Sequence, residues 1–176
     1  MADIYVILTQ SGSLTSKLLR KITKDEFTHS SLAFDPSLNE MYSFARRYRS
    51  IPFYAGFVKE SKDTGMLKKY KSSNIQIIKL QIDTEKLQEL QNTIKDMYIA
   101  RKSYKYSFKG VLAAYFGKEY KREKYYYCSE FVKKMLVDSN AVDKSALPPV
   151  TKPIDFQKLE NKEVVYTGPL DEYELY

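Results

Sequence analysis

Two residues of this sequence carry the side chains that a thiol–imidazole pair needs, and each is the only one of its type. Cys128 is the single cysteine and His29 the single histidine among 176 residues. A cysteine attacks a carbonyl carbon as its thiolate, which a nearby imidazole or a helix N-terminus stabilises. The pair therefore predicts nucleophilic chemistry on an amide or ester carbonyl, with His29 as the general base.

The pattern after Cys128 predicts an amphipathic helix that begins close to this residue. One face of that helix would carry Cys128, Phe131, Val132, Met135 and Leu136. Three consecutive tyrosines, 125–127, precede it and are typical of a strand. A thiol in the first helical turn would face unpaired N–H groups and the positive end of the helix dipole. The alternative is a buried structural cysteine, since free cysteine is among the most buried residue types.

His29 is expected at the start of a strand over residues 28–34. Ser31 shares its face, because side chains alternate along a strand. A turn at residues 35–37 would join this strand to another over residues 40–44, which makes a hairpin. A lone histidine is more often structural, so the catalytic hypothesis depends on His29 and Cys128 occurring together.

The remaining pattern predicts one α+β domain over residues 1–176, since no repeat or linker interrupts it. Further strands are expected over 4–8, 75–82 and 164–166. Further helices are expected over 14–22, over 84–98 with Asp83 or Thr84 as its cap, and over 108–116. Residues 45–73 are expected to form a long excursion with little regular structure, and loops of that length are often functional.

Composition narrows the classes of protein. The net charge is +7, yet the basic residues are spread widely and no zinc-finger, RNP or P-loop pattern occurs, so a solubilising surface is favoured over nucleic-acid binding. No run approaches the roughly 18 apolar residues of a membrane span, and the N-terminus lacks a basic leader, so a cytoplasmic location is expected. One cysteine excludes an internal disulfide and a multi-cysteine zinc site.

Residues 101–127 combine many tyrosines with many lysines. The favoured interpretation is helices whose aromatic side chains face the core and whose lysines face water. Two alternatives stay open. One is an amphipathic rim that holds a lipid or an acidic peptide, with peripheral membrane contact, and the other is stacking on single-stranded nucleic acid.

Three strings, "FTHSSLAFD", "EMYSFARR" and "YYYCSEFVKKML", resemble the circularly permuted branch of the NlpC-type papain-like superfamily of cysteine amidases and peptidases. These are the YiiX/YaeF-type proteins, distant relatives of lecithin:retinol acyltransferase. In ordinary members the cysteine helix precedes the histidine strand, whereas here His29 precedes Cys128, which is the permuted order. The resemblance implies a papain-like fold, with an antiparallel sheet packed against helices and the nucleophile at a helix N-terminus.

The resemblance also implies a third polar residue, on the next strand, that orients the histidine. Ser43 falls at that position, with Glu40 as a rival nearer the turn. A neutral hydroxyl stabilises an imidazolium less than a carboxylate does. The backbone N–H of Cys128, with Tyr127 or Tyr126, would hold the oxyanion.

The function that follows is acyl transfer or hydrolysis through a thioester on a peptide, amide or acyl-lipid substrate, without a metal or organic cofactor. The alternative is a weakly active or inactive module of the same fold that binds a lipid or peptide. The weak partner Ser43 favours this alternative. The sequence leaves open the substrate, the choice between hydrolysis and transfer, and the oligomeric state.

Overall fold

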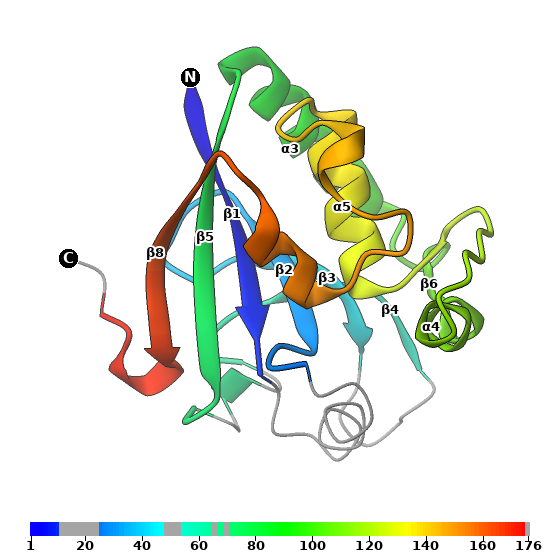
Figure 1. Ribbon diagram of the computed structural model, residues 1–176, viewed down its shortest axis with the longest axis horizontal. Helices are drawn as coiled ribbons and strands as arrows, with labels where there is room; N and C mark the ends of the chain where they lie inside the picture. The colour runs from blue at the N-terminus through cyan, green and yellow to red at the C-terminus, as the bar shows by residue number, and fades with distance from the viewer. Residues whose placement is uncertain (11–24, 48–53, 65–66, 69–70, 175–176) are drawn as a thin grey trace.

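The computed structural model describes the chain except residues 11–24, 48–53, 65–66, 69–70 and 175–176. The described strands form one eight-stranded sheet in the order β7-β6-β4-β3-β2-β1-β5-β8 (Figure 1). The strands are β1 Ala2–Thr9, β2 His29–Ala33, β3 Met41–Arg46, β4 Ala55–Glu60, β5 Asn74–Ile82, β6 Lys105–Tyr106, β7 Tyr125–Tyr126 and β8 Lys162–Pro169. The described helices are α3 Thr84–Ile99, α4 Phe108–Tyr115 and α5 Cys128–Asp138, with 3₁₀ turns η1 Lys144–Ala146, η2 Pro153–Lys158 and η3 Leu170–Glu172.

The class is α+β, as predicted, and the sheet is mixed rather than purely antiparallel. Only one described pair of neighbouring strands, β6 and β7, runs parallel. These two short strands flank α4, so α4 is the crossover between them. The expectation of an antiparallel sheet is therefore wrong at this edge, because a parallel pair needs a crossover and α4 supplies one.

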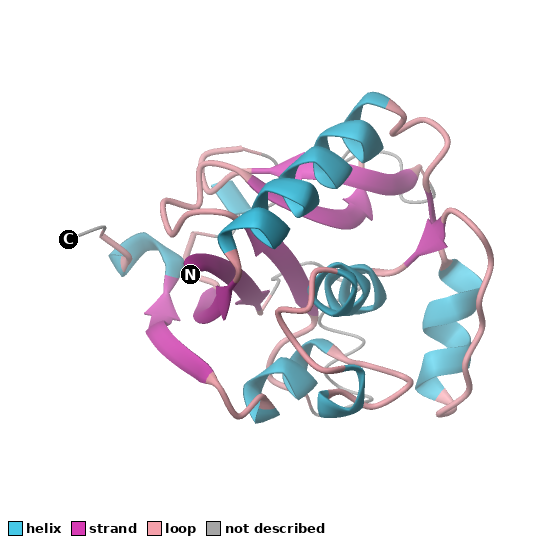
Figure 2. Ribbon diagram, turned by 90° about the horizontal axis from the view of Figure 1, so that it is seen from above, coloured by secondary structure: helices cyan, strands magenta, loops and turns pink. Residues whose placement is uncertain are grey.

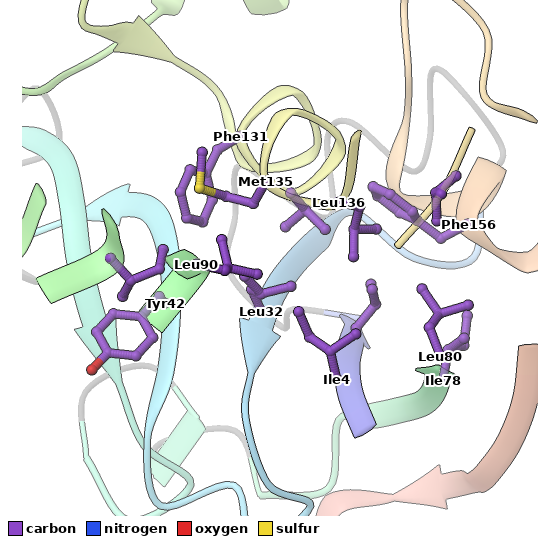
Figure 3. Close-up of a cluster of buried hydrophobic side chains, with 14 of the residues drawn as sticks. Ile4, Leu32, Tyr42, Ile78, Leu80, Leu90, Phe131, Met135, Leu136 and Phe156 are labelled. Atoms are coloured by element: carbon purple, nitrogen blue, oxygen red, sulfur yellow. The ribbon is translucent and has the colours of Figure 1, made fainter. Parts of the chain in front are cut away.

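Helices α3 and α5 pack on one face of the sheet, and in Figure 2 α5 is seen nearly end-on with the longer α3 running past it. The larger core lies between them and the strands, and it includes Phe131, Met135 and Leu136 of α5 above Ile4 and Leu32 (Figure 3). A smaller cluster on the other face includes Tyr5, Ile7 and Ile77. Strand β1 therefore lies in apolar surroundings on both faces, which explains its unbroken apolar run.

Most predicted elements are present near their expected bounds. The hairpin of β2 and β3 pairs Leu32 with Tyr42, and the predicted final strand is longer than expected, as β8. The Asp83 side chain caps α3 by accepting from two backbone N–H groups, those of Glu85 and Lys86. The helix expected over 14–22 lies outside the described residues.

The prediction of little regular structure over residues 45–73 is wrong where the structure describes this range, because it contains the end of β3 and all of β4. Strand β3 continues to Arg46, and β4 pairs along it from Met41↔Glu60 to Arg46↔Ala55. The physical reason is burial of Phe57, whose ring lies 5.5 Å from that of Phe44. Gly56 in this strand is needed because a side chain there would collide with the backbone carbonyl oxygen of Tyr104.

The importance of β4 can be measured through Phe57. Replacing this fully buried ring by alanine is expected to lower the free energy of unfolding by about 3–5 kcal/mol, because it leaves a cavity in the core. Val58→Ala, at a half-buried neighbouring position, is the matched control, with an expected loss under about 1.5 kcal/mol. Urea unfolding measures both, and equal small losses would contradict the packing of β4.

Candidate active site

Cys128 is the first residue of α5, as predicted. Tyr127, the N-cap, has extended backbone angles (φ −104°, ψ 169°), so the chain changes from strand to helix immediately before the thiol. The Glu130 carboxylate accepts from the Tyr127 backbone N–H at 3.4 Å and thereby closes the helix start. The backbone N–H of Cys128 has no acceptor within the helix, since the first N–H groups of a helix never do. It remains available to a ligand.

The other two residues of the motif have structural contacts. The Ser129 hydroxyl donates to the carbonyl of Thr151 at 2.8 Å, which ties the helix start to the segment before η2. Glu130 is half-buried, and burial raises its pKa to about 7. Both side chains therefore serve the start of α5 and not the chemistry of the thiol.

His29 is the first residue of β2 and lies opposite Thr9 of β1. Its imidazole and the Cys128 thiol lie close enough for each to shift the pKa of the other, although the two residues are far apart in the sequence. The thiol is almost fully buried, with 7% of the residue exposed. The structure therefore brings the two predicted residues into one site.

Three side chains surround the Nε2 atom of His29. The Glu60 carboxylate is closest, with its Oε2 at 3.0 Å, and the hydroxyls of Ser43 and Ser31 each lie at 3.3 Å. The Ser43 hydroxyl donates to the Ser30 carbonyl at 3.0 Å, and the Ser31 hydroxyl donates to Glu60 at 2.7 Å. Both hydroxyls therefore use their hydrogen elsewhere and can only accept from the ring.

This arrangement assigns the proton on the imidazole. A ring nitrogen that faces a carboxylate and two hydroxyls acting as acceptors must carry hydrogen, so Nε2 is the donor to Glu60. Nδ1 is then the nitrogen left for Cys128. Ser43 rather than Glu40 lies beside a ring nitrogen of His29, but the charged partner of that nitrogen is Glu60.

Glu60 is the residue that the sequence did not reveal. The predicted rival Glu40 instead bonds to Tyr42 and Lys59, away from the histidine. Glu60 ends β4, and β4 was not recognised as a strand. The place of Glu60 on the same sheet face as Ser43 follows from the pairing of β4 with β3, in which Val58 lies opposite Ser43 and Glu60 opposite Met41.

The charges of the site support one another. Burial opposes charge on His29, but the Glu60 carboxylate and the bond to Cys128 raise its pKa well above the ordinary value. Burial likewise acts to raise the pKa of Glu60, yet the imidazolium and the Ser31 hydroxyl lower it. Both shifts favour an ionised His29–Glu60 pair at neutral pH.

The thiol is affected in the same way. Burial would raise the pKa of Cys128, but the hydrogen bond and charge of His29, with backbone groups of Ser30 and Ser129, lower it below the ordinary value. The pKa shifts of Cys128, His29 and Glu60 together favour a thiolate, an imidazolium and a carboxylate side by side. A thiolate so placed is a nucleophile at neutral pH.

A cavity of about 100 Å³ opens beside Cys128 and is walled largely by apolar groups. Tyr106 and Tyr127 both line it, and Tyr106 was not among the predicted oxyanion donors. Burial, the Cys128 charge and Tyr127 raise the pKa of Tyr106, so its hydroxyl stays protonated and can donate. Tyr126, the other predicted donor, does not line this cavity and packs its ring 5.3 Å from Phe44 in the core.

No protein-family model matches the chain, and no curated protein matches it. Among the residues that the structure describes, no group of three or more histidine, cysteine, aspartate or glutamate side chains could hold a metal ion. None of the described helices is long and apolar enough to cross a membrane. The geometry of the site itself therefore carries the functional conclusion.

Proposed function

We propose that this protein is a cysteine hydrolase or acyltransferase that cleaves an amide or ester bond through a thioester on Cys128. We also propose that its fold is the papain-like fold of the circularly permuted NlpC type, as the sequence resemblance implies. The observation that carries the function is the group of three side chains at the N-terminus of α5, in which His29 bonds to Glu60 and lowers the pKa of Cys128. Such a group supplies a nucleophile, a proton carrier and an orienting carboxylate.

In the first half-reaction the Cys128 thiolate attacks the substrate carbonyl and a carbon–sulfur bond forms. The developing oxyanion accepts from the backbone N–H of Cys128 and from a tyrosine hydroxyl in the cavity. The tetrahedral intermediate collapses as His29 gives its Nδ1 proton to the leaving amine or alcohol. A thioester and a neutral imidazole remain.

In the second half-reaction neutral His29 removes a proton from water or from an acceptor alcohol or amine. The activated oxygen or nitrogen attacks the thioester, and the carbon–sulfur bond breaks. The thiolate and the imidazolium are restored, so no oxidant, metal or organic cofactor is consumed. Throughout, Glu60 accepts from Nε2–H and keeps Nδ1 aimed at the sulfur.

Glu60 also weakens the alternative of an inactive binding module. That alternative rested on Ser43 as a neutral partner for His29. A carboxylate at 3.0 Å stabilises the imidazolium by charge as well as by hydrogen bonding. Ser43 and Ser31 are then positioning residues that accept from the same ring nitrogen and help to hold the imidazole in place.

The direct test is to trap the acyl-enzyme. The protein is mixed with p-nitrophenyl butyrate, and intact-mass spectrometry follows one butyryl group on Cys128 that hydroxylamine removes, as it does from a thioester. A burst of nitrophenol should accompany the adduct, and Cys128→Ala should abolish both. Acylation of lysines alone, or an undiminished rate in Cys128→Ala, would exclude the proposed function and favour a ligand-holding role.

The tyrosine donor can be identified separately. Tyr106→Phe removes a buried hydroxyl from the cavity, and butyrate ester turnover is expected to fall on the order of 10²-fold. Alkylation by iodoacetamide should be unchanged, because that reaction forms no oxyanion. Tyr127→Phe is the matched variant, and a larger loss there would assign the donor role to Tyr127, as expected from sequence.

A further inference from the structure

Helix α4 presents an apolar face to the outside of the molecule. Its residues Phe108, Leu112 and Tyr115 are 47%, 62% and 48% exposed, and the capping residue Phe116 is 65% exposed. These four residues follow one another at intervals of four, three and one positions, so their side chains lie on one side of the helix. The expectation that the aromatic groups of residues 101–127 face the core is therefore wrong for α4, since a helix in a globular domain normally buries this stripe.

The same segment carries nearly all of the excess positive charge. Residues 101–124 contain eight basic and two acidic side chains, a net charge of +6 out of +7 for the chain. Every one of the eight lies in an exposed position: Arg101, Lys102, Lys105, Lys109, Lys118, Lys121, Arg122 and Lys124. We call these residues, with the exposed face of α4, the α4 surface.

We propose that the α4 surface docks on an anionic phospholipid bilayer. Exposed phenylalanine and leucine side chains suit the boundary between headgroups and acyl chains, and surrounding lysines and arginines suit the phosphates. Docking goes beyond the proposed function and does not depend on catalysis at Cys128.

Two other occupants fit the observations less well. In a symmetric dimer the α4 surface of one copy would face the α4 surface of the other. Two segments that each carry a net charge of +6 would then repel each other. Nucleic acid would satisfy the charge but leaves exposed aliphatic groups such as Leu112 without a partner. A bilayer satisfies both the charge and the apolar face.

Docking in this orientation would set the mouth of the cavity against the lipid. Val111, Ala114 and Tyr115 line the cavity from α4, and Tyr115 is also part of the exposed face. In Figure 1 α4 lies beside the start of α5 and at the side of the molecule away from β8. An apolar substrate group leaving the bilayer would therefore meet the wall of the cavity first, and this step alone rests on the proposed function.

The apolar part is tested by sedimentation with vesicles. The protein should bind mixed phosphatidylglycerol and phosphatidylcholine vesicles, and binding to phosphatidylcholine alone should be at least about tenfold weaker. The double variant Leu112→Ser, Phe116→Ser should bind the mixed vesicles at least about tenfold more weakly. Val164→Ser, Val165→Ser is the matched control, because these residues are 47% and 40% exposed on β8 and should not affect binding.

The electrostatic part is tested by charge and salt. Lys109→Glu should reduce binding at least about fivefold, whereas Lys71→Glu, at an exposed position before β5, should not. Raising salt from about 0.1 M to about 1 M should release the protein, because the screening length falls from about 10 Å to about 3 Å.

The outcomes separate docking from catalysis. Cys128→Ser should bind vesicles like the wild type, and the Leu112, Phe116 variant should keep its rate of Cys128 alkylation, which also shows that its site is folded. Equal binding of the wild type and that variant would overturn the proposal, as would equal binding to neutral vesicles. Salt-sensitive capture of single-stranded RNA in place of vesicles would assign the surface to nucleic acid and overturn it too.

Discussion

Iodoacetamide is expected to alkylate Cys128 of the wild-type protein readily near pH 6, about two units below the ordinary range of a free thiol. The thiolate is stabilised by the charged His29 and by the start of α5, which together lower the pKa of Cys128. His29→Ala removes the charge and leaves the helix start alone. At pH 6 the variant should therefore react at least about tenfold more slowly, and its curve should move to higher pH.

The direction of this shift follows from the coupled titration of the two groups. Glu60 raises the pKa of His29, so the imidazolium persists over the pH range in which Cys128 has already lost its proton. Intact-mass spectrometry at a series of pH values measures the curve, and Cys128→Ser must show no labelling, since the chain has no other cysteine. Coincident curves for the wild type and His29→Ala would mean that no thiolate–imidazolium pair forms.

Glu60→Gln is expected to lower ester turnover at neutral pH on the order of 10²-fold or more, without unfolding the site. The amide oxygen can still accept from Nε2–H, but the negative charge that stabilises the imidazolium is gone. The pKa of His29 should fall, and the alkaline limb of the turnover profile should move to lower pH. The profile of turnover against pH therefore reports the charge of Glu60 and not only its shape.

Ser43→Ala is the matched variant, because Ser43 also lies 3.3 Å from the same ring nitrogen but adds no charge. Its turnover is expected to fall only a few-fold, with an unchanged alkaline limb, since a neutral hydroxyl contributes little to imidazolium stability. If Ser43→Ala loses more activity than Glu60→Gln, the residue that orients His29 is Ser43, as the sequence predicted.

Much of the fold was predictable from local patterns. The buried strand β1, the helix α3 with its Asp83 cap and the start of α5 at Cys128 each depend on residues within a few positions of one another. Periodicity and capping chemistry act over that range, so a sequence expresses them directly. Strand β4 is short, contains a glycine and ends in lysine and glutamate, so its local sequence does not resemble a strand. It is stabilised by burial of Phe57 against rings that are distant in the sequence.

The sequence by itself determined the residues of the candidate site: one thiol at a helix start, one imidazole at a strand start and the parity that places Ser43 beside it. Tertiary structure decided which partner the imidazole has, because Glu60 reaches His29 only through the pairing of β4 with β3. It also decided that Tyr106 rather than Tyr126 lines the cavity, and that α4 turns its apolar side outward. These outcomes depend on contacts between segments far apart in the chain, and no local pattern encodes them.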